Sequence, residues 1–219
     1  GTPASELFKN YEDQIIEIGL TPNRGDASSH LGVARDIKAL YKTDIKNTIP
    51  NNWPEKADTK KLEVQLKNPE ACPRYAGIVI SDLKIEESPD WLKNRIKAIG
   101  LSPINNVVDV TNFILHDLGQ PLHAFDYDKI KGQKVIVKTG LGKSKFKTLD
   151  EVDRTLDNED LMICDAEGPM CIGGVFGGIN SGVTDSTSSI FLESACFDPV
   201  FIRKTSQRHT LKTDAAFRF

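Results

Sequence analysis

Glu193 is the ionisable residue whose neighbours most strongly indicate chemistry. It follows the apolar run at residues 190–192, and small or apolar residues dominate positions 194–197. These surroundings predict a buried carboxyl group, which is costly unless it is paired or hydrogen-bonded. The residues alone leave two interpretations of Glu193 open, a structural ion pair and a functional partner.

His123 is a second candidate for chemistry. It lies in residues 119–126, where Gly119 and Pro121 predict a rigid, turn-like segment directly after the end of a helix. These residues alone favour a hydrogen-bonded structural histidine over a site residue. The four histidines and four cysteines lack the spacing of a zinc site, and no standard hydrolase or phosphate-loop motif is present. We therefore predict no metal site, and reduced, mostly buried thiols.

Residues 173–178 read GGVFGG and follow a predicted strand. The spacing is not GxGxxG, and no helix obviously follows. A sharp turn, or a place where the backbone approaches a ligand closely, is therefore favoured over a phosphate-binding loop.

The elements that must position these residues are short and mixed. Capping residues and helical spacing predict helices over residues 28–40, 88–100, 107–118 and 198–208. Alternating or apolar runs predict strands at residues 62–66, 74–83, 135–137, 161–163, 170–172 and 190–192. Because these elements intermingle without regular βαβ alternation, we expect an α+β fold with a mixed, largely antiparallel sheet and packed helices.

Local details of three helices follow from the same patterns. Asp26 or Ser28 is predicted to cap the first helix, and Ser88 the second. The third is expected to bury a face made by Val107, Val110, Ile114 and Leu118. Thr111 and Asn112 fall just beside that face.

The domain organisation is predicted from composition. Residues 46–61 contain two prolines, several asparagines and many charges, which is typical of an exposed connection. We expect an amino-terminal helical segment at residues 1–45 and a main body at residues 60–219. The chain closes without a cap, glycine or proline after its last element, so we expect the body to be truncated at its carboxyl end.

Charge and hydropathy limit the partners. The formal net charge of −3 provides no general attraction for nucleic acid, so any RNA contact must be local. The chain has no signal-peptide pattern and no apolar stretch of membrane-spanning length. A cytoplasmic protein without a membrane partner is expected.

Several unusual strings carry a family resemblance. Residues 21–26, 30–35, 106–112, 118–126, 173–178 and 208–215 occur in the order found in the beta subunit of bacterial phenylalanine–tRNA ligase. The chain resembles the B3/B4 editing module of that subunit over nearly its whole length. The resemblance implies a hydrolytic domain of a class II aminoacyl-tRNA synthetase that removes tyrosine misattached to tRNA(Phe).

The resemblance also implies a set of substrate-binding residues. Glu193 and His123 match positions expected to recognise the tyrosyl hydroxyl or to orient water, and no catalytic residue is firmly assigned. The other residues expected to line the pocket are Thr111, Asn112, Gly174, Gly177, Thr213 and Ala215.

The implied parent is an α₂β₂ enzyme that uses ATP and Mg²⁺, with no cofactor in this fragment. Its implied partners are the acceptor end of tRNA(Phe) carrying a misattached tyrosine, the alpha subunit and the remaining beta-subunit domains. Two alternatives stay open. One is a non-catalytic scaffold for tRNA or partner domains, and the other is a free-standing relative that acts on a different acyl-tRNA or amino acid.

Overall fold

The computed structural model describes residues 1–7, 13–46 and 60–219. Its helices are α1 (Ala4–Leu7), α2 (His30–Tyr41), α3 (Asp90–Ala98), α4 (Asn106–Leu118), α5 (Pro199–His209) and α6 (Asp214–Arg218). Short 3₁₀ turns are η1 (Gly25–Ala27), η2 (Tyr127–Lys129) and η3 (Lys131–Gln133). The strands are β1 (Glu63–Leu66), β2 (Arg74–Ile80), β3 (Leu122–Asp126), β4 (Lys134–Lys138), β5 (Lys145–Lys147), β6 (Asp153–Thr155), β7 (Met162–Cys164), β8 (Pro169–Ile172), β9 (Phe176–Gly177) and β10 (Ile190–Cys196).

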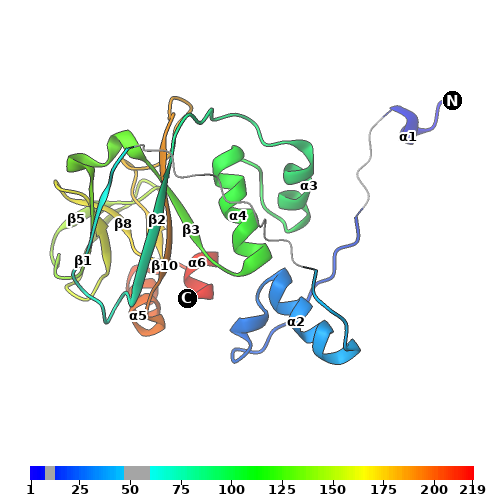
Figure 1. Ribbon diagram of the computed structural model, residues 1–219, viewed down its shortest axis with the longest axis horizontal. Coiled ribbons are helices and arrows are strands. Elements are labelled where there is room, and N and C mark those ends of the chain that lie inside the picture. Colours follow the sequence, from blue (N-terminus) through cyan, green and yellow to red (C-terminus); the bar gives the residue numbers. More distant parts are fainter. Residues whose placement is uncertain (8–12, 47–59) are drawn as a thin grey trace.

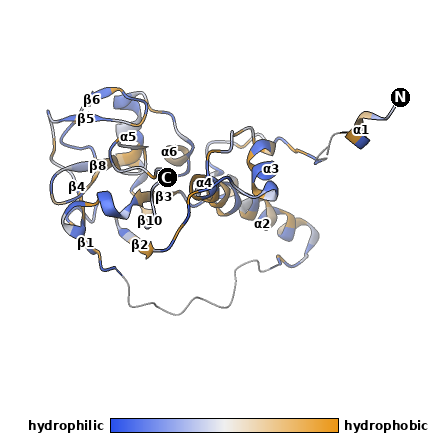
Figure 2. Cartoon of the chain, turned by 90° about the horizontal axis from the view of Figure 1, so that it is seen from above, coloured by the Kyte–Doolittle hydropathy of each residue, from blue (hydrophilic) through white to orange (hydrophobic). Residues whose placement is uncertain are grey.

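The strands pair in three sheets. The first has the order β1-β4-β7-β8-β9, and only its β1–β4 pair is parallel. The second has the order β2-β10-β3, and the third joins β5 to β6; all of these pairs are antiparallel. In Figures 1 and 2 the strands gather at one end, α2 and α3 lie at the other, and α4 lies between. The predicted α+β class with mainly antiparallel sheets is confirmed.

The apolar core takes residues from the first two sheets and from α5. Strand β10 contributes to it with a period of two, since Phe191, Glu193 and Ala195 are buried and Leu192 and Ser194 are half-buried. This alternation follows from the pleat, which directs successive side chains to opposite faces. The predicted burial of Glu193 is confirmed, on a strand that extends beyond the predicted residues 190–192.

Helix α4 begins and ends with specific caps. The Asn105 side chain accepts hydrogen bonds from two backbone N–H groups of the first turn, and Gly119 ends the helix with a φ of 82°. The prediction that Ser88 caps α3 is wrong. Pro89 occupies the cap position, and the Ser88 hydroxyl donates to Asp109 of α4 at 2.5 Å.

The buried face of α4 also differs from the prediction. Val110 and Leu118 are 44% and 37% exposed, whereas Asp109 and Leu115 are buried. The prediction considered only apolar side chains, but a buried carboxylate with hydrogen-bond donors can occupy the inner face of a helix. Thr111, one turn before Leu115, is half-buried as a result.

The first long helix, α2, has a different cap from those predicted. Ser29 Oγ accepts a hydrogen bond from the N–H three residues further on. Asp26 instead forms an ion pair with Arg24, and the Ser28 hydroxyl donates to the backbone oxygen of Gly25. Neither predicted residue is therefore free to cap α2.

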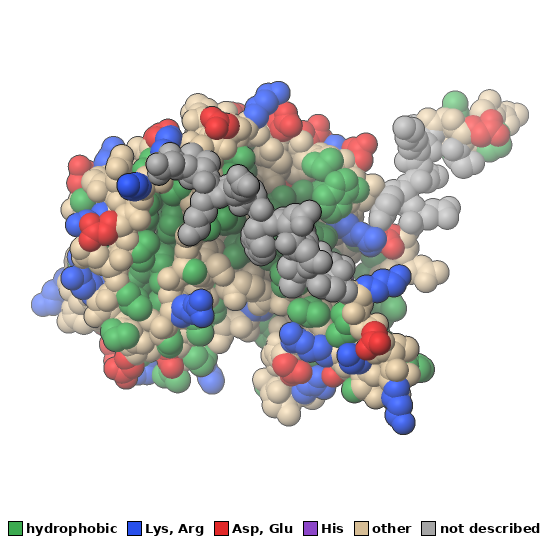
Figure 3. All heavy atoms as spheres, viewed as in Figure 1, with side chains coloured by type: hydrophobic (Ala, Val, Ile, Leu, Met, Phe, Trp, Pro, Cys, Tyr) green, Lys and Arg blue, Asp and Glu red, His purple; other side chains and the backbone are tan. Residues whose placement is uncertain are grey.

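The described surface carries charges of both signs. Figure 3 shows basic and acidic side chains intermingled over the visible face. Most of the predicted connection at residues 46–61 lies outside the described residues. No helix in the described ranges is long and apolar enough to span a membrane.

All four cysteines are free thiols. Cys72, Cys164 and Cys171 are buried and Cys196 is exposed, which confirms the prediction of mostly buried thiols. Within the described residues, no group of three or more His, Cys, Asp or Glu side chains could hold a metal ion.

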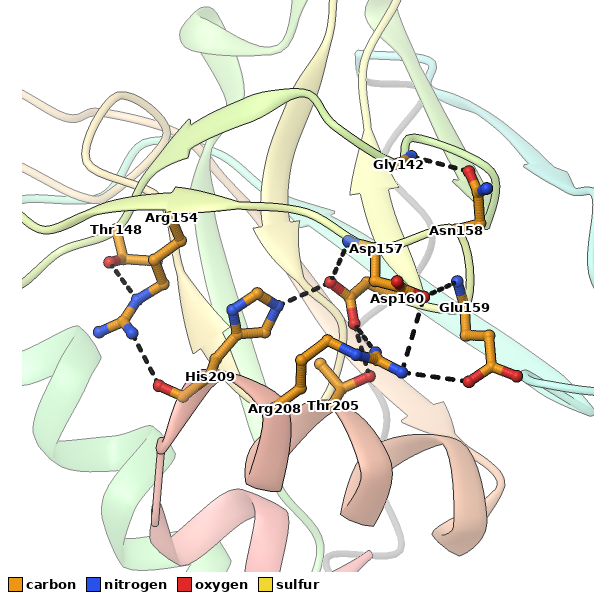
Figure 4. A network of polar contacts seen from close by, with 10 residues as sticks. All are labelled: Gly142, Thr148, Arg154, Asp157, Asn158, Glu159, Asp160, Thr205, Arg208 and His209. Atoms are coloured by element: carbon orange, nitrogen blue, oxygen red, sulfur yellow. Dashed lines mark hydrogen bonds and ion pairs between the residues drawn. The ribbon is translucent and has the colours of Figure 1, made fainter.

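A buried polar network joins α5 to the loop before β7 (Figure 4). Asp160 is fully buried, forms an ion pair with Arg208 and lies 2.6 Å from His209 Nε2. It also accepts hydrogen bonds from Thr205 Oγ1 at 3.1 Å and from the backbone N–H of Asp157 at 2.8 Å. Burial opposes ionisation of Asp160, but these donors hold the pKa of its carboxyl group below the usual value.

We expect Asp160→Ala to lower the free energy of unfolding by about 3–5 kcal/mol, because it leaves buried partners uncompensated. Urea denaturation at pH 7 measures the change. Since the folded-state pKa of Asp160 is depressed, its stabilisation of the wild type decreases as the pH falls through that pKa, and the variant lacks this part of the acid sensitivity. The control is Glu159→Ala at an exposed partner of Arg208, expected to cost less than about 1 kcal/mol. Equal effects of the two substitutions would refute the structural role of Asp160.

Candidate functional site

The candidate site is built on one face of the sheet β2-β10-β3. Glu193 is directly opposite His123 of β3 on one side and Gly77 of β2 on the other. Tyr75 is opposite Ala195, two residues beyond Glu193 on the same face. The sheet thus places a carboxyl group, an imidazole ring and a phenol on three neighbouring strands.

Glu193 has a specific partner within this face. The Tyr75 hydroxyl donates a hydrogen bond to Glu193 Oε2 at 2.6 Å. Among the described residues, no group donates to Glu193 Oε1, and no cation pairs with the carboxyl group. The structural ion pair considered from the sequence is therefore absent from the described part of the chain. One carboxyl oxygen is held by the protein and the other remains available.

The protonation of Glu193 is tuned by this environment. Burial raises the pKa of its carboxyl group to about 7, and the hydrogen bond from Tyr75 opposes that rise. Burial also raises the pKa of the Tyr75 phenol well above its ordinary value, and the nearby Glu193 carboxylate adds to the shift. Tyr75 is therefore a neutral donor, and Glu193 titrates near neutral pH.

His123 lies in strand β3, which corrects the predicted turn-like segment. The segment is extended because it pairs with β10 from Leu122 to Asp126, a tertiary contact that overrides the local turn residues. The ring is half-buried and packs edge-on against Phe125, with 4.4 Å between ring centroids. Its Nε2 is buried without a hydrogen-bond partner in the described residues, and desolvation lowers the His123 pKa to about 4. The Nε2 atom of this neutral imidazole can therefore form a hydrogen bond with a ligand or with water.

All eight residues expected at the site line a single cavity of about 260 Å³. They come from α4, β3, the turn between β8 and β9, β9, β10, and the cap and first turn of α6. They are Thr111, Asn112, His123, Gly174, Gly177, Glu193, Thr213 and Ala215. The volume is slightly below the range of about 300–1,000 Å³ for drug-sized ligands and suits a group of amino-acid size.

Thr213 closes one side of this cavity. Its Oγ1 accepts a hydrogen bond from the N–H of Ala216 and so caps α6. The same hydroxyl donates to the backbone oxygen of Val175 at 3.1 Å. Thr213 therefore links the start of α6 to the glycine-rich turn at residues 173–178 by hydrogen bonds.

The two glycines expected at the site have different roles. Gly174 has a φ of 68°, the left-handed conformation that favours glycine, and it forms the sharp turn predicted from the sequence. A Cβ atom on Gly177 would lie 2.8 Å from Leu149 Cδ1 and 3.1 Å from His123 Cε1. Gly177 thus leaves space beside the His123 ring.

Sequence reasoning missed several residues of the site. Tyr75 was part of a predicted strand, but the strand pattern did not identify its partner, because pairing with β10 is a long-range contact. The cavity wall also includes Leu115, Leu149, Val175, Phe176 and Phe219, which the sequence did not single out. Alternation in β2 could have predicted which face Tyr75 occupies, but not that this face contains Glu193.

The cavity contains no activated protein nucleophile among its described lining residues. Cys171 is the thiol in the wall, and burial raises its pKa well above the ordinary value, so it remains protonated. Thr111 donates its hydroxyl hydrogen to the backbone oxygen of Val108 at 2.7 Å. The arrangement is suited to binding a polar group and orienting water.

The chain is similar to known proteins along its whole length. Residues 71–219 match the family described as the B3/4 domain. The phenylalanine–tRNA ligase beta subunit of Porphyromonas gingivalis is 52% identical over 227 residues, which cover 100% of this chain and 27% of that subunit. The beta subunit of Bacteroides fragilis is 50% identical over 224 residues, with the same two coverages. The chain therefore spans about a quarter of the length of the curated relatives it matches.

A solved structure of an N-terminal fragment of the phenylalanyl-tRNA synthetase beta subunit from Pyrococcus horikoshii is 18% identical. It aligns with a TM-score of 0.49 over 86% of this chain and 59% of that one. The family match alone covers more than half of the sequence. The protein belongs to the B3/4 domain family, and over its whole length it is similar to one segment of phenylalanine–tRNA ligase beta subunits.

Proposed function

We propose that this chain is the editing module of a phenylalanine–tRNA ligase beta subunit and hydrolyses the ester of tyrosine misattached to tRNA(Phe). One observation carries the proposal: a single small cavity contains the buried Glu193 carboxyl group and the unpartnered His123 Nε2. Buried polar groups without partners are costly, so the cavity fits a ligand that supplies both a donor and an acceptor. A phenolic hydroxyl has both capacities.

Discrimination between the two amino acids follows from Glu193. A tyrosyl hydroxyl can donate to Oε1, since Tyr75 already occupies Oε2. A phenylalanine ring would leave the carboxyl oxygen desolvated and unpaired, a penalty of about 1–3 kcal/mol. A synthetic site that is apolar rejects an added hydroxyl only weakly, so a second, polar site can supply the missing selectivity.

Hydrolysis in this cavity is proposed to use a positioned water. The ester of an aminoacyl-tRNA is already activated, and the described lining offers no strong nucleophile. The neutral His123 ring can orient water or substrate, and the tRNA itself supplies a hydroxyl near the ester. Thr111 and Asn112 border the same space as hydrogen-bonding groups.

The wider assignment rests on the relatives. We propose from this similarity that the chain is part of a cytoplasmic α₂β₂ ligase that charges tRNA(Phe) with ATP and Mg²⁺, with the alpha subunit and the other beta-subunit domains as partners. The adenylate-forming residues are expected outside this chain, which is proposed to need no cofactor of its own.

In the full-length ligase, Glu193→Ala and His123→Ala should each slow hydrolysis of tyrosyl-tRNA(Phe) by about tenfold to a hundredfold, because each removes a buried partner of the substrate. Charging with phenylalanine should persist. Single-turnover deacylation of preformed tyrosyl-tRNA(Phe) measures the effect, with the exposed Glu70→Ala as a control. Unchanged deacylation in both site variants would show that this cavity is not the site of hydrolysis and would favour a scaffold role for the chain.

Tyr75→Phe should lower kcat/KM for tyrosyl-tRNA(Phe) at pH 7 by roughly tenfold. The groups that face Glu193 are Tyr75, His123 and the thiols of Cys72 and Cys171. Only the Tyr75 hydrogen bond lowers the Glu193 pKa, so its loss raises that pKa further. A carboxylate accepts more strongly than a neutral acid, so wild-type activity should rise with pH through about 7, and the variant should need a higher pH.

The pH profile of kcat/KM, corrected for spontaneous ester hydrolysis, tests this role. Tyr127→Phe is the matched control, because the Tyr127 hydroxyl donates to the backbone oxygen of Lys61 and, within the described residues, has no contact with Glu193. A Tyr75→Phe enzyme that is slower at every pH, with an unshifted midpoint, would contradict the proposed control of Glu193 by Tyr75.

Gly177→Ala should reduce deacylation while leaving folding nearly unchanged. The added methyl group would enter the cavity beside His123, and its closest neighbour, Leu149, is half exposed at 49% and can move. Thermal unfolding and tyrosyl-tRNA(Phe) hydrolysis are measured together. Gly19→Ala is the control, since nothing lies within 4 Å of its added Cβ. Full activity of Gly177→Ala would show that the space beside His123 is not used by the substrate.

A further inference from the structure

A second cavity, of about 560 Å³, lies on the other side of the wall formed by β8, β9 and the end of β5. Four lysines from separate segments line it, Lys129 and Lys131 near the 3₁₀ turns and Lys145 and Lys147 on β5. We call it the lysine cavity. This concentration of positive charge is unusual in a chain whose net charge is −3.

Two of these lysines have partners within the protein. Lys129 Nζ donates to the backbone oxygen of Gly182 at 2.7 Å and lies 3.7 Å from Asp126 Oδ2, and Lys145 Nζ donates to Thr155 Oγ1 at 2.7 Å. Lys131 and Lys147 are exposed, and their ammonium groups have no partner among the described residues. These two charges are therefore available to a ligand.

The two acidic residues of the lining do not neutralise this charge completely. Asp165 is largely buried, and both of its carboxyl oxygens accept hydrogen bonds from backbone N–H groups of Lys131, Glu167 and Gly168. Asp165 therefore stabilises the backbone that forms this part of the cavity wall. Glu167 is exposed and forms no ion pair with the lysines in the described structure.

The lysine cavity is a direct neighbour of the candidate editing cavity. Two segments contribute consecutive residues, one to each cavity: Met170 and Cys171 of β8, and Gly178 and Gly177 at the end of β9. Because neighbouring residues of an extended strand face opposite sides, the two cavities share one wall. Only this wall separates the lysines from the editing cavity, so a ligand as large as a tRNA can contact both.

We propose that the lysine cavity binds backbone phosphates of the tRNA whose aminoacyl end occupies the editing cavity. The inference rests on the proposed editing function, which requires an RNA ligand at this place. Lysine ammonium groups act as point charges toward phosphates, and binding releases counterions from the RNA. A local cluster of this kind provides the RNA contact that the negative net charge does not.

The test compares the double variant Lys131→Glu/Lys147→Glu with Arg35→Glu/Lys97→Glu. The control pair makes the same charge change on α2 and α3, which lie at the opposite end of the molecule from β5 (Figures 1 and 2). Fluorescence anisotropy measures binding of uncharged tRNA(Phe) to the 219-residue chain at several salt concentrations. Hydrolysis of tyrosyl-tRNA(Phe) and of a tyrosyl ester of adenosine is measured in the full-length ligase.

The cavity variant should bind tRNA at least about tenfold more weakly, and the slope of log K against log salt should fall by roughly two, one for each lost phosphate contact. Its kcat/KM should fall for tyrosyl-tRNA(Phe) but not for the adenosine ester, which lacks the phosphates. The control pair should leave affinity and slope nearly unchanged.

Equal losses in the two double variants, or no loss in either, would overturn the proposal. Preference for polyglutamate over RNA would also overturn it and would assign the cavity to an acidic protein partner. If the wild type hydrolyses neither ester, the editing function fails, while the tRNA-binding measurements still decide whether the lysine cavity recognises RNA.

Discussion

Burial of the Glu193 carboxyl group in the central strand β10 is the constraint on which the rest of the site depends. The strand needs partners on both sides to bury that position, and β2 and β3 provide them. The cost of desolvation is offset in part by the Tyr75 hydroxyl and in part by protonation, since the Glu193 pKa is raised to about 7. The carboxyl group consequently retains one oxygen that a ligand can satisfy.

The elements around β10 enclose this group. Helix α4 and the turn between β8 and β9 form two walls, and α6 is fastened to that turn by Thr213. Helix α5 is held in turn by the buried Asp160, whose partners include Arg208 and His209 at the end of the helix. Because α5 contacts α6, this polar network at a distance from the cavity supports one of the helices that line it.

The same wall gives the protein two chemically different surfaces. On one side lie the neutral His123 ring and Glu193, in an otherwise mainly apolar cavity. On the other side, lysines line the larger of the two cavities. The proposed ligand, tyrosyl-tRNA(Phe), has a phenolic end and an anionic body, which is the combination that these two surfaces suit.

Local patterns in the sequence determined most of the elements and the burial of Glu193. Apolar runs predicted β1, β2, β4, β7, β8 and part of β10, and Asp198 before Pro199 predicted the start of α5. The helix caps were less predictable. Ser29, and not Asp26 or Ser28, caps α2, and the Ser88 hydroxyl donates to Asp109 and does not cap α3. A short polar side chain can bond to several neighbours, and tertiary packing selects among them.

Only the tertiary structure decided the partners of the site. The residues around His123 predicted a turn but form a strand, because their backbone pairs with β10 through hydrogen bonds. Tyr75 reaches Glu193 from a position 118 residues earlier in the chain, and no local pattern encodes such a pairing. By itself the sequence determined that Glu193 is buried and therefore needs a partner. The pairing of β2 and β3 with β10 determined that the partner is a phenol and that one carboxyl oxygen stays free, because hydrogen-bond geometry depends on which strands meet.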